Sequence, residues 1–404
     1  MFDEVLLEFC DTTRDAVRLA REGVELRPID GYLFEVVSPI LKATPAARSL
    51  FLKDDKLLSP GDRLHQPRLA DSLEALAAEG AGLFYEGDFG ARLVRLCQES
   101  GGLLNEDDLA GYRVHRRKPF ICDYRGHRVA TNPPPSCGGI LIGFALALLA
   151  EEDPARLEHG SVDELRLLAR VMELTNKARV EARLEEAAGD SAEEAAAERL
   201  FEPGLVARYQ EEVQGHASFS RGTTHISVVD AEGNLAAMSL SNGEGCGTLL
   251  PGSGIMMNNM LGEEDLNRGG FHHWPLDSRL SSMMAPSLAT SAEGSRFAIG
   301  SGGSNRIRTA VLQVLVNLLD HGLDMAPATE APRLHVEGSV ANLEGGTPTE
   351  AEKALREQGF ETIAWPPHNL FFGGVHGVGL SREGRLSAAG DPRRGGAALV
   401  IAAD

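Results

Sequence analysis

The chain has 404 residues with ordinary apolar and charged fractions, 43% and 24%, so it can bury a large core or form two lobes. Its formal net charge of -20 leaves no basic surface to offset phosphate repulsion, which argues against nucleic acid or an anionic membrane as a partner. The five cysteines form no CxxC or Cys/His cluster, so neither a disulfide framework nor a zinc site is indicated, and we expect no cofactor and no metal.

The first part of the chain predicts helices. Three segments have apolar residues at helical spacing and end on glycine, which suits the left-handed residue that follows a helix: 12–23, 67–80 and 88–102. The opening residues are acidic and amphipathic, without the basic start and apolar stretch of a secretion signal. The residues alone therefore predict a protein that stays where it is made.

A strand, a rigid proline turn and a core helix are predicted next, over residues 127–153. The apolar run 138–150 is too short to span a bilayer, so we expect no membrane span. Residues 161–187 predict a longer amphipathic helix.

From Thr223 the pattern changes to strands. "THISVVD" and "LAAMSLS" are short and β-rich, and the intervening "AEGN" holds the glycine and asparagine that hairpins favour. Residues 297–323 predict a strand, a glycine turn and a helix, and residues 372–404 predict three further strands.

Thr223 is the first candidate for chemistry. A threonine hydroxyl needs an adjacent base, and a cut between Gly222 and Thr223 would give Thr223 a free α-amine beside its own hydroxyl. The pKa of such an amine is about 8, close enough to neutrality for a general base. The competing interpretation is that Thr223 and Thr224 simply begin a strand, and the motif alone favours it.

Three later segments hold further candidates, each with an ordinary structural alternative. In "GSGGSNR" the backbone amides of Gly302 and Gly303 could face a developing oxyanion at a helix start, or the segment could be a flexible turn; it lacks the Lys-Ser/Thr ending of a phosphate loop. Ser281 and Ser282 could donate to a substrate carboxylate or belong to a polar turn. The acidic run that begins at Glu263 could receive an ammonium group or be a solvated loop.

Taken in order, these segments resemble the γ-glutamyltransferase (γ-glutamyl transpeptidase) family of N-terminal-nucleophile hydrolases. The resemblance rests on "TTHISVVDAEGN", "GIMMNNML", "RLSSMMAPSL", "GSGGSNRI" and "DPRRGGAA", preceded by "LAREG", "GGLLNEDDLAGYRV" and "NPPPSCGG". It covers nearly the whole chain. Each motif is weak alone, but five in the same order make coincidence implausible.

The resemblance implies an α+β fold, the αββα sandwich. It implies a precursor cut autocatalytically between Gly222 and Thr223, so that residues 1–222 resemble the large subunit and 223–404 the small one, and the two fragments stay associated. Thr223 would attack a γ-glutamyl amide such as glutathione. The acyl group would then pass to an amino acid, a peptide or water.

The resemblance also implies roles for other positions of this chain. Ser241 would assist the nucleophile, and Gly302 and Gly303 would hold the oxyanion. Ser281 and Ser282 would bind the donor carboxylate, and Glu263 would bind the donor ammonium. The position of the family's amide near the nucleophile is Gly243 here, with Asn242 adjacent as the candidate substrate contact. A second family position, whose polar side chain contacts the donor ammonium, is Met260 here, so two of the family's ammonium contacts are altered. A related acylase acting on a glutaryl or cephalosporin-type amide is therefore the alternative.

The front of the chain also departs from the family. Members normally begin with a secretion signal and a segment that carries an arginine for the donor carboxylate, and this chain starts after that segment. The resemblance thus predicts a fragment or a reduced member, in a family that is periplasmic or secreted. A non-catalytic remnant that does not mature is the third possibility.

Overall fold

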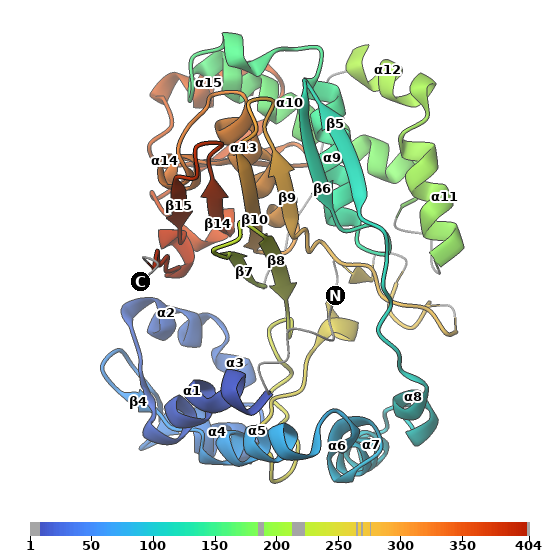
Figure 1. The fold of residues 1–404 in the computed structure, drawn as a ribbon, viewed down its shortest axis with the longest axis vertical. Coiled ribbons are helices and arrows are strands. Elements are labelled where there is room, and N and C mark those ends of the chain that lie inside the picture. Colours follow the sequence, from blue (N-terminus) through green and yellow to red (C-terminus); the bar gives the residue numbers. More distant parts are fainter. Residues whose placement is uncertain are drawn as a thin grey trace. The chain divides into compact units, whose positions relative to one another are not determined.

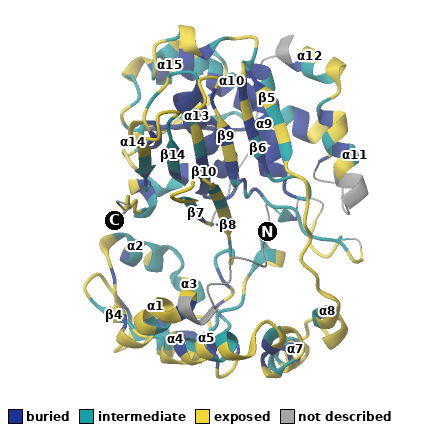
Figure 2. Cartoon of the chain, in the orientation of Figure 1, coloured by how far each residue is buried: buried dark blue, intermediate teal, exposed yellow. Residues whose placement is uncertain are grey.

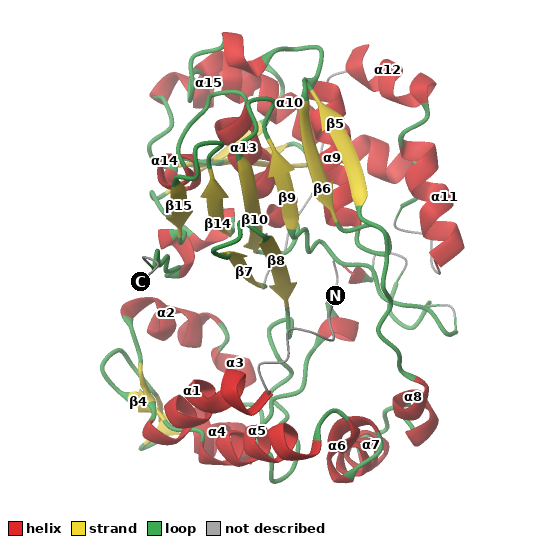
Figure 3. Ribbon diagram, in the orientation of Figure 1, coloured by secondary structure: helices red, strands yellow, loops and turns green. Residues whose placement is uncertain are grey.

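The computed structural model describes residues 9–184, 190–211, 223–263, 266–267, 270–274 and 276–401. The chain forms two compact units, and neither is continuous in sequence. Unit 1 comprises Met1–Arg116 and Glu244–Asn259, and unit 2 comprises Arg117–Gly243 and Met260–Asp404. The predicted order, a helix-rich first part followed by strands, is confirmed over the described residues (Figure 3).

Unit 1 is mostly helical, and a segment from late in the sequence completes its core. Leu250 packs with Leu83 and Phe89, and Ser72 Oγ donates a hydrogen bond to the carbonyl of Ser253 at 2.8 Å. Its helices are α1 (Phe9–Glu22), α2 (Pro28–Val36), α3 (Ser38–Leu41), α4 (Pro45–Phe51), α5 (Pro67–Glu79), α6 (Gly82–Tyr85), α7 (Asp88–Glu99) and α8 (Glu106–Gly111). Two short ribbons pair β1 (Val24–Glu25) with β4 (Arg63–Leu64) and β2 (Leu52–Lys53) with β3 (Lys56–Leu57).

Unit 2 is built on a six-stranded antiparallel sheet of order β15-β14-β10-β9-β6-β5 (Figure 1). Its strands are β5 (Phe120–Tyr124), β6 (His127–Thr131), β9 (Ser287–Thr290), β10 (Arg296–Gly302), β14 (Gly374–Leu380) and β15 (Leu386–Ala389). A separate hairpin pairs β7 (Thr224–Val229) with β8 (Leu235–Leu240), as the sequence predicts.

The central strand β10 has two different faces, because successive side chains of a strand point to opposite sides. Ile299 joins the large core formed with the helices α9 (Cys137–Leu149) and α13 (Arg306–Leu319). After Arg296 at the start of the strand, the opposite face carries only the small residues Ala298, Gly300 and Gly302, and the β7–β8 hairpin packs there. Nearly every residue of α9 is buried, which confirms the predicted core helix (Figure 2).

The remaining elements of unit 2 add a three-stranded sheet and further helices. The sheet has the order β11-β12-β13, with strands β11 (Leu334–Glu337), β12 (Val340–Glu344) and β13 (Glu361–Trp365). The helices are α10 (Val162–Glu181), α11 (Asp190–Leu200), α12 (Pro203–Glu211), α14 (Met325–Glu330) and α15 (Thr349–Glu357). Helix α10 packs on α9, β11 and α15. No helix in the described ranges is both long and apolar enough to cross a membrane.

One strand prediction is wrong. Residues 372–404 were expected to supply three strands, but only β14 and β15 form, and described residues 397–401 adopt no regular structure. Leu399 and Ile401 there are largely exposed. An apolar β-branched run becomes a strand only when a neighbouring strand offers backbone partners, which this segment lacks in the described part of the chain.

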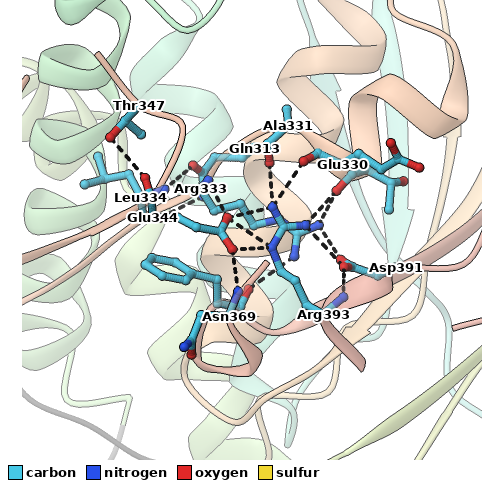
Figure 4. Close-up of polar contacts among 12 residues, drawn as sticks. Gln313, Glu330, Ala331, Arg333, Leu334, Glu344, Thr347, Asn369, Asp391 and Arg393 are labelled. Carbon is cyan, nitrogen blue, oxygen red and sulfur yellow. Dashed lines mark hydrogen bonds and ion pairs between the residues drawn. The ribbon is translucent and has the colours of Figure 1, made fainter. Parts of the chain in front are cut away.

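A buried ionic cluster ties the end of the chain to the three-stranded sheet (Figure 4). Arg393 lies 2.6 Å from Glu344 and 3.2 Å from Asp391, and Arg333 lies 2.6 Å from Asp391. All four side chains are at most 2% exposed. Burial acts to raise the pKa of Asp391, but the two arginines and backbone N–H groups outweigh it and hold the pKa below its ordinary value. The cluster is therefore charged and internally neutralised.

We expect a pH-dependent contribution to stability from His321, which follows α13. Its Nε2 lies 2.6 Å from the buried Glu164 carboxylate at the start of α10, and this hydrogen bond raises the pKa of His321. A raised pKa means that the stabilisation is complete below the ordinary value of about 6.5 and is lost as pH rises through the folded-state pKa. Urea unfolding of the wild type should show the free energy of unfolding fall by about 1–3 kcal/mol as the pH rises through the folded-state pKa of His321. His321→Gln should remove the pH dependence, and an unchanged slope in that variant would contradict the assignment.

Candidate active site

The β7–β8 hairpin brings Thr223 and Ser241 together although they are 18 residues apart in sequence. Its register pairs Thr224 with Leu240, so Thr223 and Ser241 occupy the next opposed positions, just outside the ladder. Both line one small cavity of unit 2. The hydroxyl of Ser241 also accepts a hydrogen bond from the backbone N–H of Gly243 at 3.0 Å. The predicted pair of hydroxyls is thus assembled by local hairpin geometry.

The cavity has a volume of about 20 Å³, which is enough for one water-sized group. Its polar lining consists of four hydroxyl residues and one carboxylate: Thr223, Ser241, Ser282, Ser304 and Glu263. Its apolar lining is formed by Met260, Leu266, Met283, Met284 and Ile307. An oxygen atom that entered this space would meet hydroxyl groups, one carboxylate and apolar side chains.

Gly302 allows Thr223 to lie directly on β10. A Cβ atom added at Gly302 would stand 1.7 Å from the carbonyl oxygen of Thr223, so no other residue fits there without displacing it. Gly303 has φ of +130°, a conformation that favours glycine, and a Cβ atom added there would stand 2.9 Å from the Cα of Gly373. The two glycines remain candidates for the oxyanion site. Gly302 adjoins Thr223, and neither glycine is part of the cavity lining.

We expect Gly302→Ala to disable the site. The added methyl group must push the Thr223 backbone off β10, and displacements of about 1 Å at a reacting group can cost about 10²-fold in rate. Overpacking should also lower the free energy of unfolding by about 1–3 kcal/mol. Gly204→Ala in α12 is the matched control, since nothing lies within 4 Å of a Cβ atom there. Equal turnover and equal urea midpoints for the two variants would contradict this account.

His225 anchors the hairpin beneath the site, and the sequence analysis missed it. It is 4% exposed, its Nδ1 lies 2.8 Å from Ser239 Oγ, and its Nε2 lies 2.9 Å from Ser227 Oγ. A Cβ atom at Gly300 would stand 2.3 Å from the imidazole ring. Burial, with a smaller effect of His376, lowers the pKa of His225 to about 4. The imidazole is therefore neutral at neutral pH and holds β7 against β10.

The two candidate serines have different surroundings. Ser282 lines the cavity, and its Oγ lies 3.2 Å from Ser136 Oγ. Ser281 is not part of the lining, and its Oγ lies 3.1 Å from Cys137 Sγ. The backbone N–H of Cys137 donates to the carbonyl of Ser282 at 2.9 Å, so the start of α9 holds this segment in place.

The acidic candidate and its neighbours are also placed. Glu263 and Met260 both line the cavity. Asn242 is exposed and is not part of the lining. Gly222, on the other side of the proposed cut, lies outside the described residues, as do the two acidic residues after Glu263.

Residues 6–401 match the family model described as Gamma-glutamyltranspeptidase. The chain belongs to the gamma-glutamyltranspeptidase family. Two curated members are each 30% identical to it: the acylase ACY 1 proenzyme of Pseudomonas sp. (strain SE83), over 98% of this chain and 72% of the relative, and the glutathione hydrolase proenzyme of Escherichia coli (strain K12), over 94% and 69%.

A solved structure supports the fold of this family member. The cephalosporin acylase from Bacillus halodurans superimposes with a TM-score of 0.84 at 21% identity, over 98% of this chain and 75% of that one. The chain therefore has the α+β, αββα-type fold of N-terminal-nucleophile hydrolases, and the fold prediction is confirmed. The two relatives, an acylase and a glutathione hydrolase, are equally similar to this chain. The comparison therefore identifies the gamma-glutamyltranspeptidase family and does not single out one activity within it.

Proposed function

We propose that this chain is a self-cleaving amide hydrolase and acyltransferase in which Thr223 is the nucleophile. The observation that carries the proposal is the meeting of Thr223, Ser241 and Ser282 at one oxygen-sized cavity. A weak alcohol needs an activating base and a stabilised oxyanion: the freed α-amine of Thr223 would be the base, and the hydroxyl-lined cavity lies beside the nucleophile.

In the maturation step, the Thr223 hydroxyl attacks the carbonyl carbon of Gly222. The C–N bond breaks, the nitrogen of Thr223 takes the hydroxyl proton, and an ester joins the two residues. Water then hydrolyses the ester, leaving a carboxylate on Gly222 and restoring the hydroxyl. Residues 1–222 and 223–404 become two chains that remain associated.

In turnover, the freed α-amine accepts the proton of the Thr223 hydroxyl as that oxygen attacks the donor amide. The amine returns the proton to the departing nitrogen, and an acyl ester on Thr223 remains. An amino acid, a peptide or water then attacks the ester and loses its proton to the same amine. The bond between the acyl carbon and the Thr223 oxygen breaks, and the amine passes the proton to that oxygen, which restores the hydroxyl. Ser241 assists the nucleophile, and the amides of Gly302 and Gly303 stabilise the oxyanion.

The first choice of donor is a γ-glutamyl amide such as glutathione. Glu263 at the cavity supports it, since a carboxylate there suits the α-ammonium group of the donor. Ser281, Ser282 and Asn242 complete the donor contacts in this proposal. The glutathione hydrolase among the relatives is consistent with this donor.

A second donor class has its own support. Met260 stands where the family has a polar contact to the donor ammonium. Leu266, Met283 and Met284 make the cavity wall beside Glu263 apolar. Such a wall suits an acyl group without an ammonium, as in a glutaryl or cephalosporin-type amide, and an acylase is also among the relatives.

Two substrates that differ only in the ammonium group separate these proposals: γ-glutamyl and glutaryl para-nitroanilide. Preference for the γ-glutamyl compound, reduced in Glu263→Gln without a matching loss on the glutaryl compound, supports the first donor. Good glutaryl turnover with no γ-glutamyl turnover overturns it in favour of the acylase. A single intact band on denaturing electrophoresis after long incubation, with neither substrate consumed, would mark a non-catalytic remnant.

A further inference from the structure

Ser136, the residue just before α9, lies against the segment that carries the two candidate serines. It is 6% exposed, and a parallel β-bridge pairs it with Ser282. Its Oγ is 2.6 Å from the carbonyl oxygen of Met284, 3.0 Å from the carbonyl oxygen of Ser282 and 3.2 Å from Ser282 Oγ. One buried hydroxyl therefore reaches both the backbone and the side chain of a proposed donor contact.

The two backbone carbonyls do not depend on Ser136 alone. The carbonyl of Met284 also accepts a hydrogen bond from Asn132 Nδ2 at 2.9 Å, and the carbonyl of Ser282 accepts one from the backbone N–H of Cys137 at 2.9 Å. The proton of Ser136 can therefore turn away from either carbonyl without leaving a buried acceptor unsatisfied. The contact of Ser136 with Ser282 Oγ is the one that neither Asn132 nor Cys137 duplicates.

The proton of each hydroxyl can point in more than one direction, because a hydroxyl donates one hydrogen bond and accepts others. A carbonyl oxygen can only accept, so without substrate Ser136 donates to Met284 at 2.6 Å and accepts from Ser282. When a carboxylate binds at Ser282, the Ser282 proton turns to it and Ser136 can turn its own proton to Ser282 Oγ. A hydroxyl that accepts one hydrogen bond while donating another is polarised and becomes a stronger donor.

We propose that Ser136 is a positioning residue for donor binding, which acts through Ser282 on the carboxylate group of the donor. The hydrogen-bond chain runs from Ser136 to Ser282 to that carboxylate, and no covalent bond forms or breaks. This inference rests on the proposed function, in which Ser282 binds the donor carboxylate. It applies to both proposed donor classes, since the γ-glutamyl and glutaryl groups each carry a carboxylate. After the proposed cut the two serines would belong to different fragments, which would then share the donor subsite.

Three para-nitroanilide substrates isolate the carboxylate in the test. The γ-glutamyl compound carries both the carboxylate and the ammonium, the glutaryl compound carries only the carboxylate, and the 4-aminobutyryl compound carries only the ammonium. Each variant is assayed per mole of mature chain that begins Thr-Thr-His. Ser136→Ala should raise KM by about 3- to 10-fold for the carboxylate substrates that the enzyme consumes, with little change in kcat. Its kcat/KM for the 4-aminobutyryl compound should equal that of the wild type.

Further variants show whether Ser136 acts through Ser282. Ser282→Ala should raise KM for the carboxylate substrates, and adding Ser136→Ala should raise KM no further, because the residue through which Ser136 acts is already gone. Ser136→Thr keeps a hydroxyl and should keep KM near the wild-type value, whereas Ser136→Cys donates only weakly and should raise it. Ser287→Ala is the matched control. It also removes a buried serine that donates to a backbone carbonyl, that of Ala285 at 3.0 Å, and should leave KM and kcat unchanged.

The outcomes separate this inference from the function on which it rests. A wild type that is neither cut nor active on any of the three compounds overturns the proposed function. If the wild type is cut and active, an unchanged KM in both Ser136→Ala and Ser136→Cys overturns the role of Ser136 alone. An equal rise for all three compounds, or a further rise in the double variant, does the same. A rise confined to the carboxylate substrates and absent from Ser136→Thr supports the role, since a purely structural serine would not distinguish the substrates.

Discussion

Thr223→Ala should remain one uncut chain without measurable turnover. The substitution removes the hydroxyl that attacks the preceding carbonyl, and without the cut no α-amine is freed to act as base. We expect a single band of 404 residues on denaturing electrophoresis, where the wild type gives two fragments, residues 1–222 and 223–404. Loss of the nucleophile should lower kcat by more than about 10⁴-fold.

Two neighbouring variants make this result specific. Thr223→Ser keeps a hydroxyl and should still be cut, at a different rate. Thr224→Ala changes an exposed residue of β7 one position away and should mature normally. Normal cleavage of Thr223→Ala, or a mature chain that begins anywhere other than Thr-Thr-His, would remove the basis of the proposed chemistry.

Glu344→Gln should cause the largest loss of stability among single charge removals in unit 2. The Glu344 carboxylate accepts hydrogen bonds from Nε and Nη2 of Arg393 and from the backbone N–H groups of Arg333 and Asn369 (Figure 4). Removing one partner of a buried ion pair leaves the other charge uncompensated, which costs about 3–5 kcal/mol. Urea unfolding should register this loss in the free energy of unfolding.

The matched control lies on the surface of the same unit. Glu352 on α15 pairs with Arg356, and the two side chains are 40% and 59% exposed. Glu352→Gln should cost at most about 0.5 kcal/mol. The double variant Glu344→Met with Arg393→Met should lose less than the sum of its single variants, because no unpaired charge remains from this pair. Equal losses in Glu344→Gln and Glu352→Gln would contradict the account of the cluster.

Local patterns predicted the elements that position the site. The alternation on either side of "AEGN" predicted the hairpin, and Gly23 and Gly80 follow α1 and α5 with positive φ. The run 397–401 was mistaken for a strand because periodicity does not reveal whether a neighbouring strand is present. The contribution of 244–259 to unit 1 could not be foreseen either, since it depends on packing between distant segments.

The site was predictable where residues meet through neighbouring positions on one hairpin or turn. Thr223 and Ser241 are opposed by hairpin register, and Gly302 follows from the end of β10. The contact of Ser281 with Cys137 joins segments 144 residues apart, and no local pattern indicates it. Ser304 was missed because serine rarely adopts positive φ, so its sequence gives no sign of its conformation.

The sheet order has a consequence for the mature protein. Cleavage at the proposed bond would leave β5 and β6 on one chain and β9, β10, β14 and β15 on the other, joined by the ladder that sets Val129 opposite Ala289. Unit 1 would likewise hold pieces of both chains, through Ser72 and Ser253. Dilution could not separate the two fragments, and exchange of one fragment for another copy of it would be as slow as global unfolding.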